Sequence, residues 1–142
     1  MWPTRIVLVD NHRIFLAAMA RFLATHAGLE VVGWACSGQE ALELVPRLNP
    51  DLVLLDLVMP DLSGLAVAQQ IKAQPDAPYV IVLTLYDELP YRAAAAEAPV
   101  DGFVSKVDAG TQLLPLIDHV VRRGMAAKST DGHPPAWAGR AR

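Results

Sequence analysis

Short apolar runs alternate with helix-like segments along this chain, and this alternation limits the fold more than any other feature. Each run is bounded by polar or turn-forming residues, which is typical of a strand buried on both faces. The runs lie at 6–9, 30–35, 51–56, 79–83 and 102–104. Strands that alternate with helices form a parallel sheet covered on both faces. The sequence therefore predicts an α/β fold, a doubly wound five-stranded parallel sheet of strand order 2-1-3-4-5.

The segments between these runs carry apolar residues at helical spacing. The predicted helices cover 12–25, a segment opened by Ser37, 64–73, a segment from Asp87 to Pro99, and 109–123. Ser37 and Glu40 have the spacing of a capping box. Two prolines conflict with helix: Pro46 is expected to shorten or kink the second helix, and Pro115 lies inside the fifth.

Composition and charge exclude several classes of protein. The chain has 142 residues, 53% of them hydrophobic, and a net charge of -3, which fits one globular domain rather than a disordered chain. Cys36 is the only cysteine, so a disulfide scaffold is excluded and a reducing compartment such as the cytosol is indicated. No apolar run is long enough to span a membrane, and the first residues lack a signal-peptide layout. The acidic balance argues against direct binding of nucleic acid.

The helical pattern is lost after Gly124. We therefore expect one domain over 1–124. The segment 125–142 is rich in Gly, Pro and basic residues, which predicts a flexible tail or the start of an interdomain linker. This segment is too short for a second domain, so any further domain would lie outside these residues.

Polar side chains end four of the five predicted strands. In the predicted strand order the carboxyl ends of the first, third, fourth and fifth strands are neighbours, and ligands bind there in such sheets. The residues at these ends are Asp10 and Asn11, Asp56, Thr84 and Lys106. Oxygen ligands with a carboxylate pair suit Mg²⁺, and a carboxylate beside this ion can attack phosphorus. An ammonium group can neutralise phosphoryl oxygens, so the set predicts a phosphoryl-transfer site.

Four segments carry a resemblance to a known family. They read Val-Leu-Val-Asp-Asn-His at 7–12, Leu-Leu-Asp-Leu-Val-Met-Pro at 54–60, Leu-Thr-Leu-Tyr-Asp at 83–87 and Gly-Phe-Val-Ser-Lys at 102–106. Together they resemble the response-regulator receiver domain of bacterial two-component signalling, over about 4–124. The wording is most similar to receivers that precede a LuxR-type helix-turn-helix output domain. The resemblance implies a flavodoxin-like receiver fold.

The resemblance also implies a role for each site residue. Asp56 would be the phosphoacceptor. Mg²⁺ would be held by Asp10, Asn11, Asp56 and the backbone carbonyl of Val58. The phosphoryl group would be bound by Thr84, Leu85 and Lys106. Phe103 matches the aromatic switch position that is coupled to Thr84.

Partners and regulation follow from the same resemblance. A sensor histidine kinase or a small acyl phosphate would donate the phosphoryl group to a cytoplasmic phosphoprotein. Phosphorylation would bias an inactive–active equilibrium at the surface of the fourth helix, fifth strand and fifth helix, or at a homodimer surface of the first and fifth helices. The chain would then be a regulatory domain with at most self-phosphorylation and autodephosphorylation. It would act in transcription regulation through a C-terminal DNA-binding domain that these residues do not contain, and it would contact neither nucleic acid nor a membrane itself.

Departures from the family pattern keep alternatives open. Asn11 stands where an acid is usual, Leu85 where a small residue is common, and Val107 where proline often follows the lysine, so a trans peptide is expected there. A receiver-fold interaction module that acts independently of phosphorylation is therefore the second hypothesis. A third, a phosphohydrolase with an aspartyl-phosphate intermediate, requires a second aspartate where this chain has His12. We interpret His12 as a helix-start residue.

Overall fold

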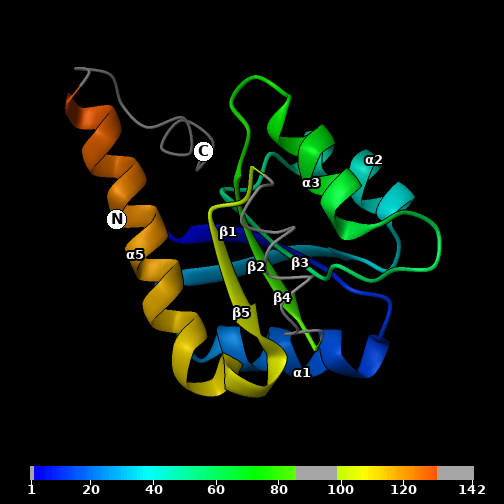
Figure 1. The fold of residues 1–142 in the computed structure, drawn as a ribbon. Coiled ribbons are helices and arrows are strands. Elements are labelled where there is room, and N and C mark those ends of the chain that lie inside the picture. Colours follow the sequence, from blue (N-terminus) through cyan, green and yellow to red (C-terminus); the bar gives the residue numbers. More distant parts are fainter. Residues whose placement is uncertain (1, 86–98, 131–142) are drawn as a thin grey trace.

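The computed structural model describes residues 2–85 and 99–130, with side chains described as far as residue 124. From β1 to β4 strands and helices alternate as the sequence predicts (Figure 1). In chain order the elements are β1 (Thr4–Val9), α1 (Arg13–Ala24), β2 (Leu29–Ala35), α2 (Gly38–Leu48), β3 (Leu52–Leu55), α3 (Gly64–Lys72), β4 (Tyr79–Thr84), β5 (Gly102–Ser105), a 3-10 helix (Lys106–Asp108) and α5 (Ala109–Thr130). The predicted fourth helix lies outside the described residues.

The sheet has five parallel strands in the order β2-β1-β3-β4-β5, which confirms the predicted fold class. Its register aligns the carboxyl ends of the strands. Val9 pairs with Leu55, and Leu55 pairs with Val82. Because Asp10 and Asp56 each follow one of these paired residues, their side chains emerge at the same edge of the sheet.

Two apolar cores cover the two faces of the sheet. Figure 1 shows α1 and α5 on one side and α2 and α3 on the other. Alternate strand residues serve the two cores: Ile6 and Leu8 pack with α1 and α5, while Val7 and Val9 pack with α2 and α3. All four are buried, and burial of each such side chain contributes about 2 kcal/mol relative to exposure. This two-sided burial explains why the strand segments are continuous apolar runs.

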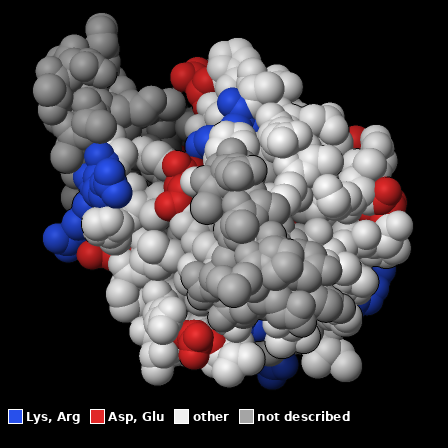
Figure 2. Space-filling model, viewed as in Figure 1, with Lys and Arg blue, Asp and Glu red and all other residues white. Residues whose placement is uncertain are grey.

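The surface carries charges of both signs. Lys and Arg side chains lie in small groups between Asp and Glu side chains and wide uncharged areas on the face seen in Figure 2. Among the described residues, no helix combines the length and the apolar character that crossing a membrane would require.

The N-terminus of α2 is capped as predicted. The Ser37 hydroxyl accepts a hydrogen bond from the Glu40 backbone N–H at 3.1 Å, and the Glu40 carboxylate accepts one from the Cys36 N–H at 2.8 Å. The return bond of this capping box therefore lies one residue before the cap residue. The first bond satisfies a backbone donor that the helix itself leaves unpaired, and the second ties the residue before the cap to the first turn.

A second anchor of α2 comes from the loop that follows β3. The Asp61 carboxylate accepts hydrogen bonds from the backbone N–H groups of Gln39, at 2.9 Å, and Gly38, at 3.0 Å. These bonds, that of Gln39 first, lower the pKa of Asp61 below its ordinary value of 3.8. An anion at a helix N-terminus is favourable, so Asp61 fixes the loop after Asp56 against α2.

The two helix prolines differ in their surroundings. Pro46 lies in the last turn of α2, which ends at Leu48, and Asn49 follows in the left-handed conformation with φ 47°. The helix thus ends soon after Pro46, as expected for a residue that disrupts the helical hydrogen bonding. Pro115 lies inside α5, which continues beyond it.

The C-terminal end of α5 differs from the prediction. The helix was expected to stop near 123 but runs to Thr130, so the beginning of the predicted tail is helical. Gly124 lies inside this helix, with its backbone against the Tyr79 side chain, where a Cβ atom would clash. The following Met125-Ala126-Ala127 segment consists of residues with high helix propensity.

Gly64 is required by a close approach between the start of α3 and the segment around Asp56. Its N–H donates to the Leu57 carbonyl at 2.7 Å. A Cβ atom at this position would lie 2.6 Å from the Leu57 Cα atom and would also meet the Asp56 carbonyl oxygen. Both neighbours are backbone atoms, which cannot turn away as a side chain can.

Gly64→Ala is therefore expected to lower the free energy of unfolding by about 2–3 kcal/mol, as overpacking does in a filled interior. Gly110→Ala is the matched control, because a Cβ atom there meets nothing within 4 Å and alanine favours helix by up to about 1 kcal/mol. Urea unfolding followed by circular dichroism measures both. Equal stability of the two variants would contradict this account.

Candidate functional site

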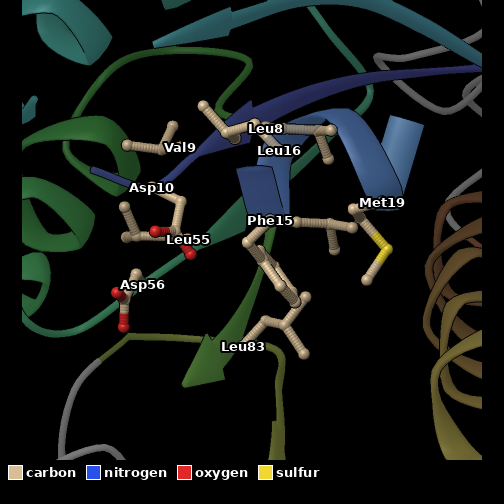
Figure 3. Close-up of a pocket in the computed structure, with 10 residues that line it drawn as sticks. Leu8, Val9, Asp10, Phe15, Leu16, Met19, Leu55, Asp56 and Leu83 are labelled. Atoms are coloured by element: carbon tan, nitrogen blue, oxygen red, sulfur yellow. The ribbon is translucent and has the colours of Figure 1, made fainter. Parts of the chain in front are cut away.

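The predicted site residues gather at the carboxyl edge of the sheet. Asp10 follows β1, Asp56 follows β3, Thr84 ends β4 and Lys106 follows β5. Asp10, Asp56 and Thr84 are 2%, 3% and 0% exposed. Figure 3 shows Asp10 and Asp56 side by side at the ends of their strands. Polar groups this deeply buried need specific partners.

Lys106 is the common partner of the two carboxylates. Its Nζ lies 2.5 Å from the Asp10 Oδ2 atom and 3.6 Å from the Asp56 Oδ2 atom, and its side chain is 6% exposed. The same Nζ lies over the Phe15 ring, 4.1 Å from its centre. Buried charges are tolerated only when they are paired, and a cation over an aromatic face gains further attraction. Lys106 therefore compensates the charge of this site.

Backbone bonds fix both carboxylates in place. The Asp10 N–H donates to the Ala35 carbonyl and the Asp56 N–H donates to the Val9 carbonyl, each at 3.0 Å. The Asp10 Oδ1 atom accepts from the backbone N–H of His12 at 2.8 Å. The Asp56 Oδ1 atom accepts from the N–H of Val58 at 3.4 Å. The sheet thus fixes the backbone of each aspartate, and the loop that follows orients its carboxylate.

The donor set fits a divalent cation. Asp10, His12 and Asp56 each offer a ligand atom, and these atoms lie within 4.8 Å of one another. The Asn11 side-chain oxygen is buried and has no hydrogen-bond partner among the described residues. A buried acceptor without a donor is costly, and a cation bound within its reach would satisfy it. Oxygen ligands of this kind suit Mg²⁺.

A small cavity lies behind the two carboxylates. Its volume is about 10 Å³, and Leu8, Phe15 and Leu83 contribute to its walls (Figure 3). This volume is at the lower limit for one water molecule. The interior here therefore has no room for an organic cofactor.

The remaining predicted site residues surround this group. Thr84 pairs in register with Ser105, the residue before Lys106. Leu85 is 61% exposed and lines an open hollow of about 280 Å³, together with His12, Phe15, Lys106 and Val107. Phe103 lies on β5 beside Val82 of β4 and is half-buried. No cis peptide bond occurs among the described residues, so the bond from Lys106 to Val107 is trans, as expected.

Two residues near the site were not assigned to it from the sequence. Phe15 has the spacing of an inward-facing helix residue, and its contact with Lys106 depends on the fold. His12 is the N-cap residue of α1, as predicted, but its side chain caps no helix N–H. Its ring Nδ1 instead lies 3.1 Å from the Asp10 Oδ1 atom. The spacing of Asp10 and His12 is the one sequence signal that could have indicated this contact.

Comparison with known proteins identifies the family. The family model of the response regulator receiver domain matches residues 6–118. The chain belongs to the response regulator receiver domain family. The response regulator protein VraR of Staphylococcus saprophyticus is 31% identical over 111 residues, which cover 78% of this chain and 53% of that protein. The response regulator GacA of Pseudomonas aeruginosa is 36% identical over 103 residues, which cover 72% of this chain and 48% of that protein.

Solved structures give the same result for this receiver domain. A LuxR-family two-component response regulator from Aurantimonas sp. has a TM-score of 0.79 at 28% identity and covers 84% of this chain and 86% of that one. A LuxR-family DNA-binding response regulator from Staphylococcus aureus has a TM-score of 0.77 at 26% identity and covers 82% of this chain and 98% of that one. The predicted resemblance to receivers of the LuxR class is confirmed. The receiver domain spans about half the length of the curated relatives it matches.

The neutral side chain at Asn11 generates a prediction about metal affinity. Asn11→Asp is expected to strengthen Mg²⁺ binding at least about tenfold, because a full charge near a divalent ion contributes on the order of a few kcal/mol at an effective dielectric of about 20. Gln70→Glu, an exposed site on α3, adds the same charge at a distance and is expected to have little effect. Titration calorimetry measures all three proteins. Equal affinities of wild type and Asn11→Asp would refute the prediction.

Proposed function

We propose that this receiver domain is a phosphorylation-controlled signalling switch that accepts a phosphoryl group on Asp56 in the presence of Mg²⁺. The observation that carries the proposal is the buried group of Asp10, Asp56 and Lys106, in which one ammonium faces two carboxylates. Membership in the receiver domain family supports it. The donor is a sensor histidine kinase or a small acyl phosphate.

In the transfer step, an Asp56 carboxylate oxygen forms a bond to phosphorus. The bond from phosphorus to the donor nitrogen or oxygen breaks, and its electron pair leaves with the donor. Lys106 neutralises charge on the phosphoryl oxygens and the Thr84 hydroxyl donates a hydrogen bond to one of them, beside the backbone at Leu85. Asp10, Asn11, Asp56 and the Val58 carbonyl would hold the metal ion. Bound Mg²⁺ would supply positive charge next to the transferred group.

Phosphorylation acts as a switch because it changes the partners of Lys106. In the unphosphorylated structure the Lys106 ammonium pairs with the carboxylates of Asp10 and Asp56. A phosphoryl group on Asp56 brings new oxygen acceptors within its reach. Thr84 and Phe103 lie on neighbouring strands β4 and β5. The family resemblance implies that a move of Thr84 toward the phosphoryl group is coupled to the position of the Phe103 ring. The result is a shift between two populations.

The output of this switch passes through its surfaces. We propose that the domain forms homodimers through α1 and α5, or through a face made of β5, α5 and the predicted fourth helix. That helix lies outside the described residues. The domain then acts in the cytoplasm as a regulatory part of a longer transcription regulator with a DNA-binding output domain. Its relatives' greater length supports the last point. It has at most self-phosphorylation and autodephosphorylation activity.

A second function is favoured by the departures at the site. Asn11 removes one acidic ligand, and the exposed Leu85 lies beside Lys106 in the hollow above the site. If the metal site is weak and Leu85 narrows the access of a phosphodonor to Asp56, the fold can act as an interaction module that does not respond to phosphorylation. The intact pairing of Asp10 and Asp56 with Lys106 favours the switch.

Incubation with acetyl phosphate and Mg²⁺ tests the switch directly. We expect one phosphoryl adduct in the intact mass of the wild type, with release of acetate, and none in Asp56→Asn, which replaces the attacking carboxylate with a neutral amide. Circular dichroism establishes that both proteins are folded. A folded wild type that takes up no phosphoryl group, while Asn11→Asp does, would favour the interaction module.

The lifetime of the adduct gives a further prediction. Val58 has no polar group to orient an attacking water, and Leu85 narrows the approach, so the phosphoaspartate is expected to persist for minutes or longer. Leu85→Ala and Val58→Asn are each expected to shorten this lifetime severalfold. The decay of the adduct mass after removal of acetyl phosphate measures it. Loss of the wild-type adduct within seconds would contradict the prediction.

A further inference from the structure

We propose that His12 is a nitrogen ligand of the cation site, which gives this receiver domain affinity for borderline transition-metal ions such as Ni²⁺, Cu²⁺ or Zn²⁺ as well as Mg²⁺. The inference rests on the proposed function only in assigning a cation to Asp10 and Asp56. It adds a side chain that the family resemblance does not assign and that changes the chemical class of ion the site binds.

The two oxygens of Asp10 face different partners. Its Oδ2 atom faces Lys106 at 2.5 Å, whereas its Oδ1 atom lies 3.1 Å from the His12 Nδ1 atom. Adjacent ligands of an octahedral ion with bonds of about 2.1 Å are about 3.0 Å apart. The Asp10 oxygen and the His12 nitrogen therefore have the separation of neighbouring ligands. An Asp56 oxygen lies within 4.8 Å of both atoms, so it is near enough to join the shell after a small movement.

The His12 ring is held where a metal ion can reach it. The His12 backbone N–H donates to the same Asp10 Oδ1 atom at 2.8 Å, which closes a short turn and directs the ring back toward the acid. The ring makes no capping bond to α1. Its side chain is 62% exposed, so an ion and its water ligands can approach from the solvent.

The charge of the site favours this class of ion. Asn11 contributes a neutral oxygen that is buried without a partner among the described residues, and Lys106 offsets part of the negative charge of Asp10 and Asp56. A site with fewer charges loses affinity for Mg²⁺, which is bound mainly by carboxylates. Imidazole nitrogen instead binds Ni²⁺, Cu²⁺ and Zn²⁺ well, and the Irving–Williams order raises their affinity further.

Metal titration of the untagged chain tests the inference with Ni²⁺ and Mg²⁺ as separate probes. His12→Gln keeps a polar side chain at an exposed position and is expected to weaken Ni²⁺ binding at least about tenfold and Mg²⁺ binding by much less, because Mg²⁺ prefers oxygen ligands. His119→Gln, on an exposed position of α5, is the matched control and is expected to bind both ions as the wild type does. Calorimetry gives the affinities.

Electron paramagnetic resonance of one bound Cu²⁺ gives an independent readout. The wild type is expected to show nitrogen hyperfine coupling, and His12→Gln is expected to lose it. Unchanged Ni²⁺ affinity in His12→Gln, or nitrogen coupling retained in that variant, would overturn the inference. The phosphorylation assay with Mg²⁺ separates the two proposals: His12-dependent Ni²⁺ binding without a phosphoryl adduct on Asp56 would leave this inference standing and refute the proposed function.

Discussion

The ion pairing of Lys106 with Asp10 and Asp56 is the interaction on which the site depends. Both carboxylates are almost fully buried, and a buried charge without a partner costs several kcal/mol. One ammonium meets both of them at the edge of the sheet. The site thus keeps an excess of negative charge that a divalent cation can offset. The Lys106 ammonium is also placed where it can pair with the oxygens of a phosphoryl group. The ion pairs of Asp10, Asp56 and Lys106 thus both compensate the buried charges and place the groups that phosphoryl transfer would need.

This pairing exists because of the strand order. Asp10, Asp56 and Lys106 are far apart in the sequence. The order β2-β1-β3-β4-β5 places the ends of β1 and β3 side by side and the end of β5 at the same edge, beyond β4. The two apolar cores hold the strands in that order, and the close approach of Gly64 to the backbone of Asp56 and Leu57 fixes the loop after Asp56. Asp61 ties this loop to α2. The core therefore determines the geometry of the site.

Most of the fold followed from the sequence because two-sided burial leaves a clear pattern of apolar runs. The gathering of Asp10, Asp56, Thr84 and Lys106 followed as well, since strand ends are easy to locate and the order of such sheets is restricted. The end of α5 did not follow, because Gly124 is a packing contact with Tyr79 and not a helix end. The contacts of His12 with Asp10 and of Phe15 with Lys106 depend on side-chain direction, which spacing alone does not determine.

The most direct test is to identify the residue that carries the phosphoryl group. Borohydride reduces an acyl phosphate to the alcohol, so treatment after acetyl phosphate and Mg²⁺ would convert a phosphorylated aspartate to homoserine. Peptide mass spectrometry then locates the change. The account predicts homoserine at position 56 and at no other acidic residue, Asp10 included. Modification of Asp10, or a stable phosphoryl adduct that resists reduction, would contradict the assignment of Asp56 as the acceptor.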